Sequence, residues 1–85
     1  MSRDVAAPEW ILEAARARGP ISRDCYRVVV VESSGELSSK DFEDRALAEQ
    51  YANDAASESD HPSPVAYVFG DRLQLVARGR HYADR

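Results

Sequence analysis

Four consecutive valines at positions 28–31 constrain the fold of this chain more than any other feature. The branched Cβ of valine makes its side chain stiff and favours strands, so residues 26–32 are predicted to form one. Successive side chains of a strand point to opposite faces of its sheet, so Val28 and Val30 face one way and Val29 and Val31 the other. Both faces of the sheet therefore need apolar cover, and one helix covers only one face.

A second, more polar strand is predicted at residues 37–42, after a Ser-Ser-Gly turn signal. An antiparallel return would pair Tyr26 with Phe42 and Arg27 with Asp41. A loop is the competing interpretation of this segment.

The clearest helix is predicted at residues 44–57, where Asp44 is placed to cap the first turn. Its apolar residues recur at helical spacing along one face, which we expect to pack on the sheet. That stripe consists of Ala48, Tyr51, Ala52 and Ala55. The opposite, polar face is expected to contact water.

A shorter helix is predicted to begin at Pro8 and to stop at Gly19, which Pro20 follows. A helix of about ten residues is not stable alone in water. Its apolar residues must therefore rest on this domain or on another chain. These residues are Trp10, Ile11 and Leu12.

Two strands joined by a two-residue turn, Gly70-Asp71, are predicted at residues 65–69 and 72–77. The first predicted face pairs Val68 with Leu73 and Ala66 with Leu75. The second face pairs Phe69 with Arg72, Tyr67 with Gln74 and Val65 with Val76. The first face is apolar and belongs under the helix at residues 44–57, whereas the second has the composition of an exposed recognition face.

These elements predict an α+β fold: a small antiparallel sheet of three to four strands with one helix packed across a face and a short N-terminal helix. We expect an N-terminal helical arm at residues 1–24, an α+β core domain at residues 25–80 and a tail at residues 81–85. A chain of 85 residues buries about 60% of its unfolded surface, enough for one core. The predicted core consists of Val28, Val30, Ala48, Tyr51, Ala52, Ala66, Val68, Leu73 and Leu75.

Charge is unevenly distributed along the chain, whose formal net charge is −4. Residues 1–31 contain five arginines and four acids, residues 32–60 two bases and nine acids, and residues 61–85 four arginines and two aspartates. An acidic middle of this kind steers association and favours a partner with a basic surface.

No pattern indicates a metal site, a cofactor or a catalytic centre, so we do not expect an enzyme. Cys25, His61 and His81 are the only soft ligands and lack metal-site spacing. The hydrolase-type residues at positions 57–61 all fall on one flexible loop, which cannot hold a preorganised triad. The glycines are too far apart to form a phosphate-binding loop.

The chain is expected to be cytoplasmic and to have no membrane partner, since no apolar run approaches the about 18 residues of a membrane span. The N-terminus lacks the apolar core of a secretory signal. Ten arginines against one lysine, with many alanines, are typical of a protein encoded by a GC-rich bacterial genome.

Nucleic-acid binding is the alternative function, because cations and aromatic residues alternate along the last hairpin and tail. These residues are Tyr67, Phe69, Arg72, Arg78, Arg80, His81, Tyr82 and Arg85. An isoelectric point of about 5.0 is the reverse of the basic footprint expected of such a domain, which disfavours this alternative.

The preferred hypothesis is a small acidic protein-interaction module of the adaptor, inhibitor, antirepressor or immunity type, which binds a protein partner or itself. Its predicted contact surface is rich in the residue types of interaction hot spots. That surface consists of Trp10, Ile11, Leu12, Tyr67, Phe69, Arg72, Gln74 and Val76. In the rival interpretation the N-terminal helix folds back over this face and completes a three-layer monomer.

Overall fold

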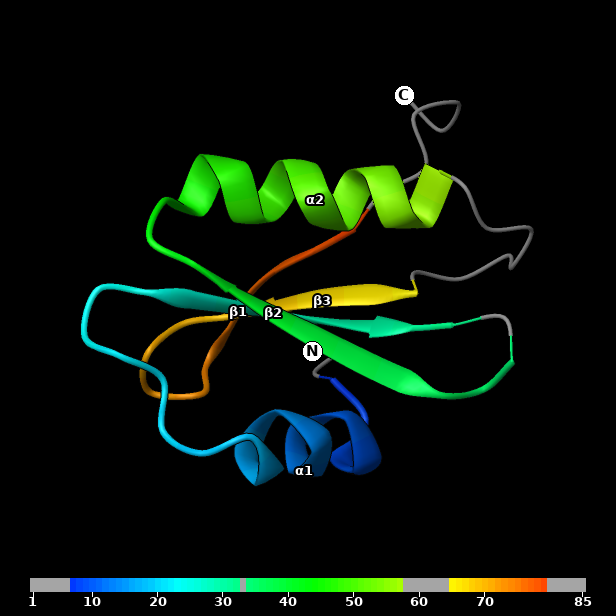
Figure 1. The fold of residues 1–85 in the computed structure, drawn as a ribbon, viewed down its shortest axis with the longest axis horizontal. Helices are drawn as coiled ribbons and strands as arrows, with labels where there is room; N and C mark the ends of the chain where they lie inside the picture. Colours follow the sequence, from blue (N-terminus) through cyan, green and yellow to red (C-terminus); the bar gives the residue numbers. More distant parts are fainter. Residues whose placement is uncertain (1–6, 33, 58–64, 80–85) are drawn as a thin grey trace, which may run out of the picture.

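The computed structural model of the chain describes residues 7–32, 34–57 and 65–79. These residues form two helices and four strands (Figure 1). In chain order the elements are α1 (Glu9–Ala17), β1 (Tyr26–Val31), β2 (Leu37–Phe42), α2 (Arg45–Ser57), β3 (Ala66–Phe69) and β4 (Leu75–Arg78). The predicted order of helices and strands along the chain is thus confirmed.

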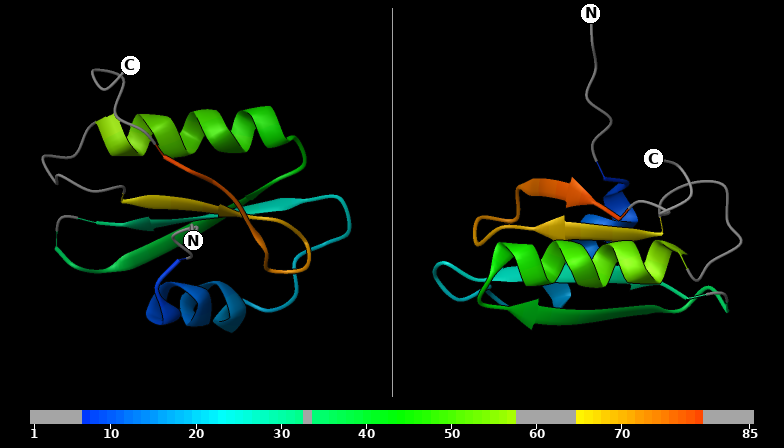
Figure 2. Two further views of the ribbon diagram at one scale, coloured as in Figure 1. Left: turned by 180° about the vertical axis from the view of Figure 1, so that it is seen from behind. Right: turned by 90° about the horizontal axis from the view of Figure 1, so that it is seen from above.

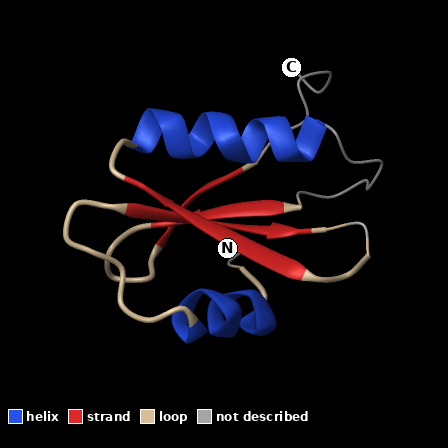
Figure 3. Cartoon of the chain, viewed as in Figure 1, coloured by secondary structure: helices blue, strands red, loops and turns tan. Residues whose placement is uncertain are grey.

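One antiparallel sheet with the strand order β2-β1-β3-β4 forms the middle layer of the fold. Helix α2 packs on one face of this sheet and α1 on the other (Figure 3). The predicted α+β fold is confirmed. Strands β2 and β4 form the two edges of the sheet.

The valine strand β1 lies in the interior of the sheet and contributes to both apolar layers. Val28 and Val30 pack in the cluster beneath α2, and Val29 packs in the cluster beneath α1. All three are buried. The alternation predicted from the valine run is therefore confirmed, and the two helices supply the two covers that it requires.

The β1–β2 hairpin has the predicted register, in which Tyr26 lies opposite Phe42 and Arg27 opposite Asp41. No register shift interrupts the pairing of these two strands. The loop interpretation of residues 37–42 is wrong, because all six residues pair with β1, and Leu37 and Phe42 at the two ends of β2 pack against the core.

Helix α2 begins as predicted, with the carboxylate of Asp44 accepting a hydrogen bond of 2.9 Å from the amide of Ala46. Alanines line its buried face, which allows close approach to the sheet. These are Ala48, Ala52 and Ala56. The approach is so close that a Cβ at Gly79 would collide with the carbonyl of Ala52.

The assignment of Tyr51 to the core is wrong, since its side chain is 37% exposed. The alanine stripe fills the centre of the helix–sheet interface, and Tyr51 lies on its flank. A tyrosine hydroxyl also favours a position with access to water.

Helix α1 packs on the sheet of its own chain, which matches the three-layer arrangement offered as the rival interpretation. Ile11 and Ala15 are fully buried against Phe69 and Val29. Pro8 stands at the N-terminal end of the helix, and its carbonyl accepts hydrogen bonds from the amides of Ile11 and Leu12.

The predicted two-residue turn between β3 and β4 is wrong. The amide of Gly70 donates to the carbonyl of Gln74, and the amide of Leu73 donates back to the carbonyl of Gly70. Leu73 has φ = 63°. A turn followed by a left-handed residue is the usual geometry of a longer, three-residue hairpin loop.

The longer turn changes every predicted pair of this hairpin. The observed pairs are Phe69 with Leu75, Val68 with Ala77 and Tyr67 with Arg78, with a register shift between Val68 and Phe69. The predicted pairs Val68–Leu73, Ala66–Leu75, Phe69–Arg72, Tyr67–Gln74 and Val65–Val76 are therefore wrong.

The new register moves Leu73 and Leu75 to the α1 side of the sheet, where they pack partly buried. Their assignment beneath α2 is wrong. The buried cluster on the α2 side consists of residues that the sequence predicted, namely Val28, Val30, Ala48, Ala52, Ala66 and Val68.

Candidate protein-interaction surface

The eight residues predicted as one contact surface are divided by the fold. Ile11 and Phe69 are fully buried between α1 and the sheet, and Leu12 is half-buried beside them. Tyr67 also packs partly buried on the α1-side cluster. The N-terminal helix thus covers the face that the predicted hairpin pairing left open.

The other four residues lie apart from that covered face. Arg72 and Gln74 are exposed in the β3–β4 turn, where a Gln74 side-chain oxygen accepts a hydrogen bond from the amide of Arg72. Val76 packs on the opposite, α2 side of the sheet. Trp10 is 54% exposed on α1.

The residues of the nucleic-acid alternative are also separated. The buried ring of Phe69 cannot stack on a base, and Tyr67 contributes to the core. Arg72 is exposed and Arg78 half-buried. The remaining residues of that set, Arg80, His81, Tyr82 and Arg85, lie outside the described residues.

Within residues 7–32, 34–57 and 65–79, no group of three or more His, Cys, Asp or Glu side chains is placed to hold a metal ion. Cys25 is half-buried and free. His61 and His81 lie outside these ranges, as does the loop at residues 58–61 considered for a catalytic triad. None of the described helices is long and apolar enough to cross a membrane.

Exposed large apolar side chains define a different candidate surface. Among the described residues they are Trp10, Leu47 at 53% exposure and Tyr51 at 37% exposure. Leu47 and Tyr51 are four residues apart on α2, so they lie one above the other on the same flank of the helix. Each directly precedes a residue of the buried alanine stripe.

The flank of α2 that carries Tyr51 faces the edge strand β2. The rings of Tyr51 and Phe42 lie 5.3 Å apart, centroid to centroid, in a tilted arrangement. Lys40 and Phe42 are two residues apart on β2 and therefore point to the same face of the sheet. Figure 2 (right) shows β2 at the side of α2 rather than beneath it.

Lys40 completes this surface with a positive charge placed over the two rings. Its Nζ lies 5.5 Å from the centroid of Phe42 and 5.6 Å from that of Tyr51, within the range of cation–π attraction. We call the residues Lys40, Phe42, Leu47 and Tyr51 the β2–α2 surface. It combines aromatic, aliphatic and cationic groups beside a sheet edge.

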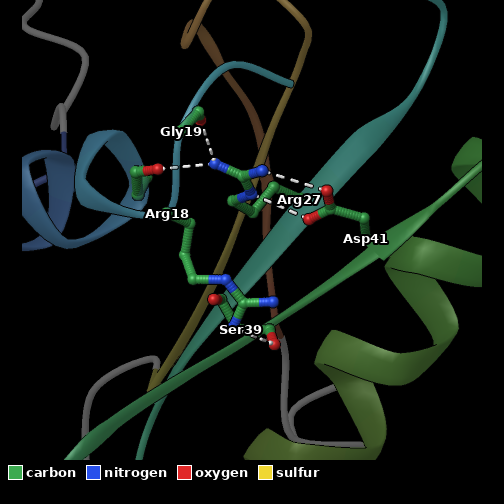
Figure 4. A network of polar contacts seen from close by, with 6 residues as sticks. Arg18, Gly19, Arg27, Ser39 and Asp41 are labelled. Atoms are coloured by element: carbon green, nitrogen blue, oxygen red, sulfur yellow. Dashed lines mark hydrogen bonds and ion pairs between the residues drawn. The ribbon is translucent and has the colours of Figure 1, made fainter. Parts of the chain in front are cut away.

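A buried arginine fixes β2 to the rest of the fold (Figure 4). Arg27 donates to both carboxylate oxygens of Asp41, at 2.7 and 3.0 Å. Its Nη1 donates to the carbonyls of Ala15 and Gly19, each at 2.7 Å, at the C-terminal end of α1. One side chain thus connects α1, β1 and β2, and its donors are paired although it is 4% exposed.

The Arg27–Asp41 pair changes the titration of both groups. The hydrogen bonds from Arg27 hold the pKa of Asp41 below its ordinary value despite the opposing effect of burial, and the charges of Arg27 and Arg18 lower it further. The bond to Asp41 also raises the pKa of Arg27. Both groups therefore remain charged at neutral pH.

Sequence reasoning missed most of the β2–α2 surface. It placed Tyr51 in the core, left Leu47 unassigned and named Phe42 only as the strand partner of Tyr26. One signal in the sequence could have indicated this surface: Leu47 and Tyr51 are four residues apart on α2, and each lies beside the stripe of alanines rather than within it. Small residues on the buried face leave no room for larger ones beside them.

Comparison with protein families, with curated proteins and with solved structures gave no match for this chain. Its function is therefore inferred from the geometry and charge of its own residues.

Proposed function

We propose that this protein is a protein-interaction module, of the adaptor, inhibitor, antirepressor or immunity type, that acts by binding rather than by catalysis. Its contact surface in this proposal is the β2–α2 surface. The observation that carries the proposal is the exposure of Leu47 and Tyr51 on the same flank of α2, beside the ring of Phe42. A contiguous apolar cluster on an otherwise charged surface is typical of an interaction site.

The residue types of this surface also favour binding to a protein. Tyrosine is enriched among interaction hot spots because it buries a large, rigid area and keeps a polar group. The charged residues around it, including the exposed Glu43 and Asp44, resemble the polar rim that surrounds an apolar interface centre. We further propose that this interaction takes place in the cytoplasm of a bacterium, and the arginine bias of the sequence supports the bacterial source.

Affinity capture with quantitative mass spectrometry tests the proposal. The wild-type protein is compared with Leu47→Ser and Tyr51→Ser, each checked by thermal melting. We expect each substitution to lower recovery of the same partner by about fivefold or more, the equivalent of about 1 kcal/mol at a hot spot. Gln50→Ser, at an exposed position between them on α2, should leave recovery unchanged.

Trp10→Ser tests the α1 side of the molecule separately. Loss of partner recovery with Trp10→Ser, together with normal recovery for Leu47→Ser and Tyr51→Ser, would contradict the assignment of the contact surface to β2 and α2. Light scattering on the purified protein distinguishes a partner of another sequence from a second copy of this chain.

A further inference from the structure

The edge strand β2 presents backbone groups that point away from β1, and the pattern of hydrogen bonds between β1 and β2 shows which residues they belong to. The amide of Glu32 donates to the carbonyl of Glu36 at 2.7 Å, so the backbone groups of Glu36 point toward β1. Backbone groups alternate in direction along a strand. Those of Ser38 and Lys40 therefore also point toward β1. The outward-pointing groups of β2 belong to Leu37, Ser39 and Asp41.

Two other contacts agree with this assignment. The amide of Val31 donates to the carbonyl of Val65, on the β3 side of β1. The backbone groups of the neighbouring Val30 therefore point toward β2, where Val30 lies opposite Ser38. Arg18 reaches the carbonyl of Ser39 from the outside of the sheet, with its Nη1 at 3.4 Å (Figure 4).

The other edge of the sheet is less suited to accept a further strand. Strand β4 has four residues and a register shift, which breaks the regular row of outward groups. The guanidinium of Arg45 already donates to the carbonyl of Val76 on β4, at 3.1 Å. Strand β2 has six residues, a regular register and no proline.

The charged groups on β2 do not obstruct its outer edge. Lysines on edge strands usually prevent strand pairing when their side chains extend from the edge. Here the ammonium of Lys40 lies over the rings of Phe42 and Tyr51, on the α2 face. Asp41 is held by Arg27, on the opposite face. The hydrogen bond from Arg18 to the Ser39 carbonyl is long, at 3.4 Å, so a backbone amide of an added strand can take its place.

Charge indicates what kind of strand fits this edge. The described part of residues 32–60, which includes β2 and α2, has seven acids against two bases, and two of these acids, Asp41 and Glu49, are paired with arginines. Among these acids, Glu36, Glu43 and Asp44 are exposed at the two ends of β2. A second copy would bring an equal negative segment against the first, whereas a basic chain would be attracted.

We infer that an extended, basic segment of a partner protein adds to β2 as a fifth strand, pairs with the backbone groups of Leu37, Ser39 and Asp41, and rests alternate side chains on the β2–α2 surface. This inference rests on the proposed function and specifies how the partner is held. Backbone pairing supplies affinity in such strand addition, and the side-chain surface supplies specificity.

Hydrogen exchange measured by NMR tests the binding geometry. The probe is a short synthetic peptide in which arginine alternates with valine, compared with a peptide in which glutamate replaces the arginine. The arginine peptide should slow exchange at the amides of Leu37, Ser39 and Asp41, while those of Ser38 and Lys40 are protected with or without it. Protection by the glutamate peptide alone, or none by either peptide, would overturn the inference.

Ser39→Pro tests the role of the backbone directly. Its ring replaces an outward amide and removes no bond to β1, a position where edge strands accept proline. We expect the affinity for the arginine peptide to fall by about tenfold or more, with Ser39→Thr as the control that keeps the amide. The exchange pattern of the wild-type protein remains decisive if Ser39→Pro does not fold.

These results can be separated from those of the proposed function. If partner capture depends on Leu47 and Tyr51 but is unaffected by Ser39→Pro in the folded protein, the interaction module stands and strand addition is wrong. Slowed exchange at Leu37, Ser39 and Asp41 at high protein concentration without peptide would identify a second copy as the occupant and would also contradict the inference.

Discussion

Replacing Leu73 with glycine should leave the protein more stable than replacing it with alanine, the reverse of the usual order. The backbone of Leu73 has φ = 63°, in the left-handed region. A residue with a Cβ loses roughly 1–2 kcal/mol there, whereas glycine adopts this conformation without that cost. The β3–β4 turn therefore carries a backbone cost that glycine removes and alanine does not.

The expected loss in the free energy of unfolding has one part that Leu73→Gly and Leu73→Ala share and one part that differs between them. Both remove the part of the Leu73 side chain that packs, half-buried, against the α1-side cluster. Because a fully buried leucine costs about 2–5 kcal/mol when truncated, we expect this shared loss to be about 1–2 kcal/mol. Glycine should then be more stable than alanine by about 1 kcal/mol, which raises Tm by about 4–8 °C in a domain of this size.

Leu75 provides the matched control. It is also half-buried against the α1-side cluster, and it lies in β4 opposite Phe69. Its φ is not positive. At this position glycine should be less stable than alanine by about 0.5–1 kcal/mol, because glycine loses more conformational freedom on folding.

Urea unfolding followed by far-UV circular dichroism gives the free energy of unfolding of all four variants. This comparison isolates the contribution of backbone conformation to the free energy of unfolding. Glycine should be the more stable substitution at position 73 and alanine the more stable at position 75. If alanine is the more stable substitution at both positions, Leu73 does not occupy the left-handed conformation and the turn geometry is wrong.

Three further predictions concern the packing, the titration and the binding of the protein. Gly79→Ala should cost about 1–3 kcal/mol in urea unfolding, because the new Cβ meets the Ala52 carbonyl and α2 must shift. The lowered pKa of Asp41 contributes stability that is complete above its unfolded pKa of about 3.9 and is lost as pH falls through its lower folded pKa. Unfolding measured against pH should therefore show Asp41→Asn to be destabilised at pH 7 and progressively closer to wild type in acid. Single-stranded DNA at low salt should show no tight retention in a mobility-shift titration, because the ring of Phe69 is buried; tight binding that weakens steeply with salt would refute this.

Local patterns were sufficient to predict the β1–β2 hairpin and α2. The valine run sets the alternation of β1, and the pairing of Tyr26 with Phe42 follows from the short turn that joins the strands. The cap at Asp44 depends on a residue next to the helix that it begins. Each of these features is decided by neighbours in sequence, so sequence reasoning recovers it.

The β3–β4 turn could not be predicted in the same way. Gly-Asp after a strand is a good signal for a two-residue turn, and leucine is an unfavourable choice for a left-handed position. The contact of Leu73 with the α1-side cluster offsets that local preference. This contact depends on where α1 docks, which is a property of the whole fold.

The candidate surface depends on strand order, which local patterns do not determine. Phe42 and Tyr51 are visible in the sequence as aromatic residues, but the position of Phe42 at the sheet edge depends on the pairing of β3 with β1, which leaves β2 at the edge. The edge position also decides that the backbone groups of Leu37, Ser39 and Asp41 point away from the sheet. The surface predicted from the sequence and the β2–α2 surface therefore differ, because the strand order and the packing of α1 bury Ile11 and Phe69 and leave Leu47 and Tyr51 exposed.

The charge pattern connects the sequence to this surface. Acidic residues are concentrated at positions 32–60, and the described part of that segment folds into two elements that contact each other, β2 and α2. Acids that are close together in the sequence, among them Glu36, Glu43 and Asp44, are thus exposed near one edge of the sheet. Because the exposed Leu47 and Tyr51 lie within the same segment, a basic partner of the proposed kind would gain from apolar contact and from opposite charge at the same place. Raised salt should therefore weaken the interaction at the β2–α2 surface without abolishing it, since apolar contact is not screened.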